Sequence, residues 1–350
     1  MRKGENIVRN KTLELQPCSH RVIIPLYIPN EEGYYQDAFK IFKMCLLSVQ
    51  KTAISPLKIS VISNGSTAIV NEKLYKLYED NYIDELIIET ETIGKINSIL
   101  KALRTAEERL ITITDADVLF LNDWEKEVIA TFEAFPKAGM VSPVPIYRTQ
   151  LRHTGNIWMD YLFSNKLKFS PVKNREGLTK FAKSVGWPDL ELHLKDVIAT
   201  LEGKNKIKAV VGNSHFVGTY KKEVFDKIPL TNSNYKLGGT SEYLYNDLPI
   251  LKMGGYQLAT YDNYAYHMGN ALEQWIEKEF ENLKTEHKQY NNFQTIKTLK
   301  ASPIKYVVSE KIFKKMFKYK GFKQWIYKQK GLTKDQIYNF LERDFLGDNN

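Results

Sequence analysis

Cysteine is nearly absent from this 350-residue sequence, which holds only Cys18 and Cys45. A disulfide framework needs more cysteines than two, and the sequence has neither a Cys-x-x-Cys pair nor a Cys/His metal spacing. Disulfides and thiolate-bound zinc are therefore excluded as the basis of the fold. We expect both cysteines to be buried thiols in a reducing compartment.

Long apolar stretches are also missing. The first residues, Met1 to Asn6, are polar and no apolar run follows them, which argues against an ordinary signal peptide. No window approaches the roughly 18 uncharged apolar residues of a membrane-spanning helix. These absences predict a cytoplasmic protein, or a peripheral one that works at the inner face of a membrane.

Acidic residues are scarce in one part of the chain. Glu310 is the only acid between Lys305 and Lys330, and it is outnumbered by nine lysines (305, 311, 314, 315, 318, 320, 323, 328 and 330). The whole chain has a net charge of +9, so its basic character belongs to this C-terminal segment. Elsewhere the composition is that of a folded protein, with 43% hydrophobic and 26% charged residues.

Short apolar runs alternate with helical patterns through the first 120 residues. Strands are predicted at 21–26, 57–62, 85–89 and 110–114, and helices at 35–51, 71–81 and 94–108. This alternation predicts an α/β fold with a mostly parallel central sheet flanked by helices. Two further strands are expected at 209–212 and 254–259, and residues 271–350 are expected to be helical.

Polar residues follow several of these strands. In such sheets ligands bind at the carboxyl ends of the strands, so we expect Asn30, Asn64, Asp115 and Asp117 to share one cleft. Two carboxylates separated by one residue at a strand end can converge on Mg²⁺ or Mn²⁺. Such an ion would bridge a diphosphate and neutralise the charge on a departing nucleoside diphosphate. The alternative is a solvated turn, because Asp-x-Asp tripeptides are common.

Five short motifs occur in the order and spacing of a known family. They are Pro25-Leu26-Tyr27 with Asn30-Glu31, Ser48-Val49-Gln50, Asn64-Gly65-Ser66-Thr67, Gly94-Lys95-Ile96-Asn97 and Asp115-Ala116-Asp117. With them the chain resembles a family 2 glycosyltransferase of the GT-A fold, closely over residues 21–148 and more loosely to about residue 270. The resemblance implies a nucleotide-diphospho-sugar transferase fold with a helical C-terminal appendage.

The resemblance also implies roles for the donor-binding residues. Matching positions near the nucleotide are Pro25, Tyr27, Asn30, Ser63, Asn64, Lys95, Asn97 and Asp115. Asp117 would bind the metal directly, and Asp115 would contact the ribose and the metal through water. Ser63 departs from the family, which has an aspartate there that reads the base, and a hydroxyl cannot supply a carboxylate's charge-assisted bond. A UDP-sugar is favoured, but Ser63 leaves the base open. Lys95 and Asn97 also fit a surface helix turn.

The catalytic base is expected near residue 242. An inverting transferase needs a carboxylate that takes the proton of the acceptor hydroxyl. In the family a Glu-Asp pair at a helix start supplies it, shortly before a Gly-Tyr like Gly255-Tyr256. Glu242 has this place, but Tyr243 stands where the aspartate is expected. We favour Glu242 over Asp247; the alternative is that Glu242 only stabilises a helix N-terminus.

A few residues of the second half are further candidates. His267 lies where GT-A enzymes place a metal or diphosphate ligand, although a histidine among tyrosines is also a common structural residue. His215 resembles the loop that lines the acceptor pocket. Trp158, Asp160 and Trp187 fall where the family varies with its acceptor, and core packing is the alternative for each aromatic ring.

The lysine-rich segment 305–330 interleaves its charges with aromatic residues. Ile312, Phe313, Met316 and Phe317 can share one helical face, and a basic amphipathic helix can lie on an anionic membrane. The same residues also fit a solvated helix packed on the catalytic domain, or a nucleic-acid contact.

The resulting hypothesis is a metal-dependent, inverting glycosyltransferase. It would move a sugar from a nucleotide-sugar to a hydroxyl of a glycan or lipid-linked acceptor, in bacterial surface polysaccharide assembly. Residues 1–20 would be an extension, 21–270 the GT-A domain with halves 21–120 and 121–270, and 271–350 a basic helical region. The alternatives are a glycosyltransferase that acts on nucleic acid and a non-catalytic nucleotide- or membrane-binding protein. A nucleotidyltransferase is disfavoured, because 27–32 lacks the glycine-rich basic loop of those enzymes.

Overall fold

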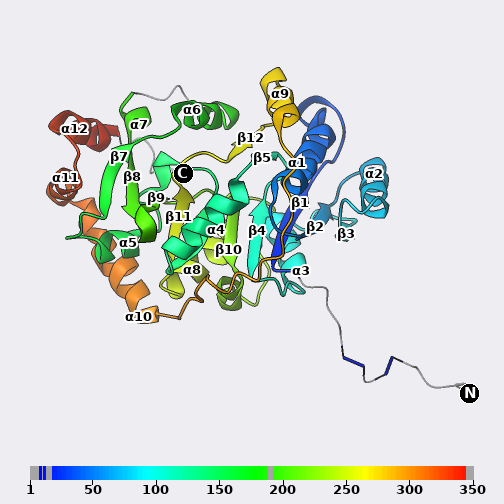
Figure 1. Cartoon of the computed structure of the whole chain (residues 1–350), viewed down its shortest axis with the longest axis horizontal. Coiled ribbons are helices and arrows are strands. Elements are labelled where there is room, and N and C mark those ends of the chain that lie inside the picture. Colours follow the sequence, from blue (N-terminus) through cyan, green and yellow to red (C-terminus); the bar gives the residue numbers. More distant parts are fainter. Residues whose placement is uncertain (1–7, 10, 13–17, 188–191, 344–350) are drawn as a thin grey trace, which may run out of the picture.

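The structure, a computed structural model, describes residues 8–9, 11–12, 18–187 and 192–343 (Figure 1). Its centre is a 10-stranded sheet with the strand order β3-β2-β1-β4-β10-β6-β11-β9-β8-β7. In that order the strands are Glu85–Glu89, Leu57–Asn64, His20–Leu26, Leu110–Thr114, Val217–Lys221, Ala138–Ser142, Tyr256–Thr260, Lys208–Val211, Val197–Glu202 and Leu167–Pro171. A second, two-stranded sheet pairs β12 (Ala265–His267) with β5 (Val118–Phe120).

The sheet is mostly parallel, as the alternating sequence pattern predicts. Strands β3, β2, β1 and β4 are hydrogen-bonded in parallel, and β6 pairs in parallel with β11. Among the ten strands only β10, β9 and β7 run the other way. The carboxyl ends of β1, β2 and β4 therefore lie along one edge of the sheet, where ligands bind in such folds.

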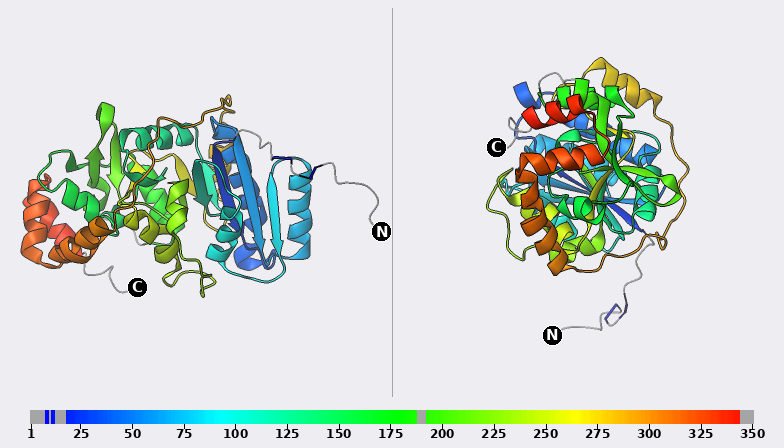
Figure 2. Two further views of the ribbon diagram at one scale, coloured as in Figure 1. Left: turned by 90° about the horizontal axis from the view of Figure 1, so that it is seen from below. Right: turned by 90° about the vertical axis from the view of Figure 1, so that its left-hand side faces the viewer.

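Helices cover both faces of the sheet (Figures 1 and 2). Their bounds are α1 Ala38–Thr52, α2 Ala68–Glu79, α3 Lys95–Leu103, α4 Trp124–Ala134, α5 Gly155–Asp160, α6 Arg175–Ser184, α7 Leu192–Asp196, α8 Leu248–Lys252, α9 Gln274–Asn282, α10 Pro303–Tyr306, α11 Lys320–Gln329 and α12 Lys334–Arg343. Because side chains alternate along a strand, Val22 and Ile24 of β1 join the core beneath α1 and α2. Ile23 joins the opposite core beneath α3 and α8.

Residues 271–343 differ in part from the helical prediction for 271–350, whose last residues, 344–350, lie outside the described residues. Helices α9, α10, α11 and α12 form, but residues 283–302 contain no helix and run as an extended strap. The strap, visible as the orange-gold line between α9 and α10 in Figure 1, is held by contacts from other elements. Glu286 N–H donates to the Lys51 carbonyl at 2.8 Å, and Gln289 N–H to that of Ile54 at 2.7 Å. Tertiary hydrogen bonds thus replace the helical ones.

The strap crosses the amino edge of the parallel strands. The side chain of Arg109, just before β4, donates to the Ile296 carbonyl. Lys221, at the end of the antiparallel β10, donates to the Lys297 carbonyl at 2.6 Å. Both attachment points lie at the edge opposite the carboxyl ends of β1, β2 and β4, so the strap leaves that ligand-binding edge open.

The C-terminal helices gather at one end of the molecule, opposite α2 (Figures 1 and 2). Of the nine lysines in 305–330, two face inward. Lys305 pairs with Asp160, and Lys330, which is buried, donates to the carbonyls of Tyr161 and Ser164. The proposed amphipathic face is wrong in one respect, since Phe313 and Phe317 are buried while Ile312 and Met316 are exposed. Within the described part of the chain, no helix has the length and apolar character that a membrane crossing requires.

Candidate functional site

Asp115 and Asp117 come directly after β4, at the carboxyl edge of the sheet. Asp115 N–H bonds to the Phe216 carbonyl at 2.7 Å, because β10 runs antiparallel to β4 and begins beside it. The pairing of β12 with β5 sets His267 opposite Val118 and so next to Asp117. Three segments that are far apart in sequence therefore meet at one point.

Asp117 and His267 make the best cation-binding pair here. His267 Nε2 lies 3.4 Å from Asp117 Oδ2, and its Nδ1 lies 3.1 Å from the Ser184 hydroxyl. The other oxygen of Asp117, Oδ1, is buried without a hydrogen-bond partner. Burial raises the pKa of Asp117, and His267 partly offsets that effect. A buried, unpartnered carboxylate oxygen beside an imidazole is a donor set that suits a divalent cation.

Asp117 and His267 would give a metal ion only two protein ligands. Among the residues that the structure describes, no group of three His, Cys, Asp or Glu side chains converges as a metal-binding set. Asp115 Oδ1 is instead paired with Lys95 Nζ at 2.5 Å. Mg²⁺ and Mn²⁺ sites in nucleotide enzymes commonly take one or two protein ligands and complete their shell with phosphate oxygens and water. Asp117 and His267 fit such a shared site.

Lys95 connects the acidic pair to Glu242. Its ammonium lies 3.7 Å from Glu242 Oε1 as well as 2.5 Å from Asp115. Burial would lower the pKa of Lys95, but the two carboxylates outweigh burial and raise it. Glu242 begins the helical stretch that continues as a π-helical turn, Tyr243–Asp247, and α8. The ammonium group of Lys95, between two carboxylates, is suited to forming an ion pair with an anionic diphosphate.

His215 is held between two carboxylates. Its Nδ1 lies 3.0 Å from Glu242 Oε2, and its Nε2 lies 2.9 Å from Asp247 Oδ1. An ionised carboxylate only accepts hydrogen bonds, so both contacts are satisfied when both ring nitrogens carry protons. Burial alone would lower the pKa of His215, but Asp247 and Glu242 raise it to about 9. The hydrogen bond from His215 lowers the pKa of Glu242 to about 2.

The two candidate bases differ in access. The side chain of Glu242 is 29% exposed, whereas that of Asp247 is fully buried behind His215. Asp247 also lies 3.7 Å from His153, which stacks on Tyr243 with ring centroids 4.9 Å apart. Burial lowers the pKa of His153 to about 4. The geometry leaves the Glu242 carboxylate accessible and places Asp247 as a support for the imidazole.

Three predicted donor-binding residues have other partners. The Ser63 hydroxyl is buried and donates to Asn71 Oδ1 at 2.6 Å. Asn64 is also buried, and its side-chain oxygen accepts the backbone N–H groups of Ile93 and Gly94. Each of these two side chains fixes a neighbouring segment, and their predicted places near the nucleotide stay predictions.

Asn97 is the third of these residues. Its amide donates to the carbonyls of Ile93 and Ser233, and its oxygen accepts the Ser233 N–H at 2.8 Å. It therefore pins the loop that precedes Glu242 onto α3. That tertiary role has no counterpart in the local motif.

The remaining donor candidates lie along the loop after β1. Tyr27 is 42% exposed and packs edge-on against Tyr35. Pro25, the sixth residue of β1, is half-buried. Asn30 is exposed and accepts the Glu32 N–H at 3.1 Å, which shapes the loop. These residues form the surface beside β2, but no hydrogen bond joins them to Asp115.

The proposed acceptor residues of the second half are structural in part. Trp158 is fully buried, and its indole N–H donates to the Gln150 carbonyl at 2.8 Å. Asp160 accepts from Lys137, Lys305 and Tyr256. Trp158 is therefore part of the core, whereas Asp160 holds neighbouring segments together through ion pairs and a hydrogen bond. His153 was not found from the sequence, since only the folded chain brings it to Asp247.

A family comparison fits this arrangement. Residues 22–185 match the model described as glycosyl transferase family 2. This region is a family 2 glycosyltransferase domain. The family assigns the chain to the glycosyltransferases, and the matched range includes Lys95, Asp115 and Asp117. Glu242 and His267 lie beyond it. No curated protein matches the sequence significantly.

Solved glycosyltransferase structures are similar to this chain at low identity. The mannosyltransferase PcManGT from Pyrobaculum calidifontis, in complex with GDP-Man and Mn²⁺, has 17% identity and a TM-score of 0.39, with 73% of this chain covering 59% of that one. TarS from S. aureus has 11% identity and a TM-score of 0.41, over 71% and 36% of the two chains. GalNAc-T7 with UDP, GalNAc and Mn²⁺ has 13% identity and a TM-score of 0.46, over 87% and 50%. The chain thus spans between about a third and three fifths of these proteins.

Proposed function

We propose that this glycosyltransferase moves a sugar from a nucleotide-diphosphate donor to an acceptor hydroxyl, with inversion and with help from a divalent cation. The observation that supports it best is the meeting of Asp117, His267, Lys95 and Glu242 at the carboxyl edge of a family 2 domain. Residues 21–270 are proposed as the catalytic unit, because the sheet strands from β1 to β12 fall within His20–His267.

Asp117 and His267 would hold Mn²⁺ or Mg²⁺ in this proposal. Such an ion, when bound, neutralises charge on the diphosphate. Lys95 would approach the same phosphates, since its ammonium lies 2.5 Å from Asp115 and 3.7 Å from Glu242. Uridine is the favoured base, although the buried Ser63 hydroxyl gives it no direct support.

Glu242 would act as the base in a single displacement. The acceptor oxygen bonds to the anomeric carbon while the bond from that carbon to the diphosphate breaks, and Glu242 takes the hydroxyl proton. In the donor-free chain the contacts with His215 and Lys95 depress the pKa of Glu242 to about 2, so it is ionised but weakly basic. A diphosphate that attracts Lys95 would remove one of these influences and strengthen the base.

The acceptor is proposed to be a glycan or lipid-linked glycan hydroxyl, in the assembly of bacterial surface polysaccharide. The support is the family itself, whose members share a fold but differ in acceptors. The half-buried Trp187 and the Arg148 side chain stacked on it at 4.0 Å lie in the region expected to contact acceptors.

Ligand-induced stabilisation tests the donor and metal proposal. A ligand that binds only the folded state raises the melting temperature. We expect one nucleoside diphosphate to raise it in the presence of Mn²⁺, and Asp117→Ala to abolish the metal-dependent part. Asp123→Ala, which removes an exposed carboxylate, is the matched control. If no nucleotide or nucleotide-sugar shifts the wild type with or without Mn²⁺, the proposal is wrong.

A further inference from the structure

The helical segment after the strap has one side turned to solvent. Exposed residues recur in pairs every four positions, at 303/304, 307/308, 311/312, 315/316 and 319/320. Between them Ser309, Phe313 and Phe317 are buried. The segment passes from α10 into a π-helical turn, Val307–Ile312, and then a 3-10 turn, Phe313–Lys318. The alternation of buried and exposed residues separates an inner side, packed on the protein, from an outer one.

Aliphatic side chains line the outer side. Ile304, Val308, Ile312 and Met316 succeed one another at four-residue intervals, and Ile304 and Ile312 are 79% and 60% exposed. Single exposed apolar residues are ordinary on protein surfaces, but a continuous row marks an interaction surface. The inner side already packs through Phe313 and Phe317, so the outer row is additional to the core.

Lysines flank the row without acids beside them. Lys311, Lys315 and Lys318 are exposed. Glu310, the only acid of 303–319, points inward with a side chain 5% exposed and accepts the Asn156 N–H. We call the aliphatic row and these three lysines the outer face. It combines apolar contact area with a positive charge that no exposed carboxylate offsets.

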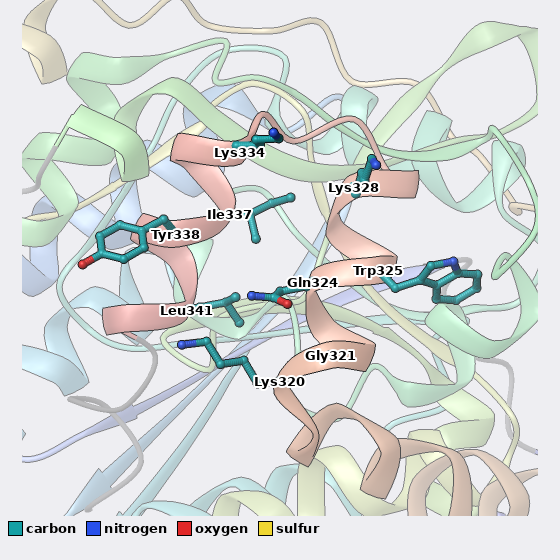
Figure 3. A pocket seen from close by; sticks show the side chains of 9 residues that line it. All are labelled: Lys320, Gly321, Gln324, Trp325, Lys328, Lys334, Ile337, Tyr338 and Leu341. Atoms are coloured by element: carbon teal, nitrogen blue, oxygen red, sulfur yellow. The ribbon is translucent and has the colours of Figure 1, made fainter.

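The same chemistry continues onto α11 and α12. A cavity of about 470 Å³ lies between these two helices, with Ile337 and Leu341 among its apolar lining (Figure 3). Lys320, Lys328 and Lys334 line it too, and no acid is among the lining residues. The combination of lysines and apolar side chains found on the outer face therefore recurs at this cavity.

We propose that the outer face docks onto the surface of an anionic phospholipid bilayer. Aliphatic side chains on a helix lying in the interface enter the headgroup region, and lysines beside them are attracted to anionic lipids. Nucleic acid fits less well, because a hydrated phosphate backbone offers nothing to the four aliphatic side chains. This inference goes beyond the proposed function and does not depend on it.

Docking would bring the catalytic helix close to the bilayer. The Tyr306 hydroxyl lies 3.3 Å from that of Tyr243, the residue after Glu242. Lys305 fixes the same segment to Asp160. The segment that carries the outer face is therefore in contact, through Tyr306, with the helical stretch that carries Glu242.

Vesicle flotation tests the lysines, with neither donor nor metal present. The wild type is expected to float with vesicles of phosphatidylcholine and phosphatidylglycerol, and not with phosphatidylcholine alone. K311E/K315E is expected to lower the partition coefficient by about thirtyfold or more, since each lysine near the surface contributes about 1 kcal/mol. K43E/K76E makes the same change of charge at exposed positions of α1 and α2, toward the other end of the molecule, and should bind like the wild type.

A second variant tests the aliphatic row. I312S/M316S keeps every charge. High salt screens charge attraction, so the binding that the wild type retains at high salt comes from its apolar side chains. We expect I312S/M316S to lose this salt-resistant binding. Thermal melting of each variant confirms that it is folded. The proposal is overturned if the wild type does not float with anionic vesicles, or if K43E/K76E loses as much binding as K311E/K315E. Binding of a nucleic-acid duplex without flotation would replace the bilayer with nucleic acid.

Discussion

At the scale of single residues, the proposed role of Glu242 as the base can be tested by replacing its carboxylate with the amide of glutamine. Its carboxylate touches His215 and faces Lys95, and it is the more exposed of the two candidate bases. We expect Glu242→Gln to lower kcat by about 10²- to 10⁴-fold, the usual contribution of a general base, while the donor's Kd changes little. Steady-state kinetics and donor titration measure both quantities.

Glu176→Gln is the control for that change, because Glu176 is a glutamate that is 76% exposed on α6. A full kcat in Glu242→Gln, or an equal loss in Glu176→Gln, would remove Glu242 from the role of base.

His215 makes stability depend on pH in a defined direction. Its pKa is raised to about 9 in the folded chain from an ordinary value of 6.5, so the folded state binds the additional proton between these values. The stabilising contribution is complete below about pH 6.5 and is lost as the pH rises through 9. We expect the free energy of unfolding to fall by up to about 1.4 kcal/mol per pH unit in this window.

Urea denaturation at several pH values measures this dependence. In His215→Gln the slope between pH 6.5 and 9 should largely disappear, whereas His287→Gln, at an exposed histidine, should retain it. An unchanged slope in His215→Gln would show that the imidazole is not protonated between its two carboxylates.

At the scale of elements, Gly94 controls how α3 meets the loop before Glu242. It has a φ of +94°, and a Cβ there would stand 2.8 Å from the Tyr235 carbonyl oxygen. Gly94→Ala adds both left-handed strain and a backbone clash, so we expect a loss of about 1–3 kcal/mol in the free energy of unfolding. Chemical denaturation measures it.

Gly331→Ala separates the two causes. Gly331 has nearly the same φ, +95°, but nothing lies within 4 Å of its added Cβ. If Gly331→Ala lowers the free energy of unfolding less than Gly94→Ala does, the difference comes from the clash with the Tyr235 carbonyl. Equal losses would mean that the loop moves to remove the clash and that only the strain in φ matters.

The elements were predictable where neighbours in sequence determine them. The ranges 85–89 and 110–114 form β3 and β4 as predicted, because short apolar runs between helices are typical of strands in parallel sheets. β4 is buried throughout, whereas β3 lies at the edge of the sheet and is partly exposed. Ser63 and Asn97 could not be assigned in this way. The motif fixes their place at the sheet edge, but Asn97 bonds to Ser233, which is 136 residues away in the chain.

At the scale of the whole molecule, Lys221 ties the strap to the sheet. Its buried ammonium donates to the carbonyls of Pro136 and Lys297, and burial lowers its pKa to about 8. Lys221→Met leaves both carbonyls without this donor, which costs about 1–3 kcal/mol. We expect lower stability in urea and faster proteolytic cleavage within 283–302.

Lys222→Met is the neighbouring control, because Lys222 pairs with Glu107 at the surface. If Lys221→Met is cut no faster than Lys222→Met, the strap is held by its other contacts alone.

The strap also marks the limit of sequence reasoning for the whole molecule. Its residues have no hydrophobic period, and their hydrogen-bond partners come from Lys51, Ile54 and Arg109. The site had a similar limit. The two aspartates follow from a strand and a motif, whereas the contact of His215 with both Glu242 and Asp247 exists only after β10 and the π-helical turn have packed together.

The position of the strap has a consequence for how the protein is made. Synthesis proceeds from the N-terminus, and early segments begin to fold before later ones leave the ribosome. Strands β1 to β4 and the helices between them emerge first, but Arg109 finds its partner only when Ile296 appears. The amino edge of these first strands therefore stays without its strap until almost two hundred further residues have been made.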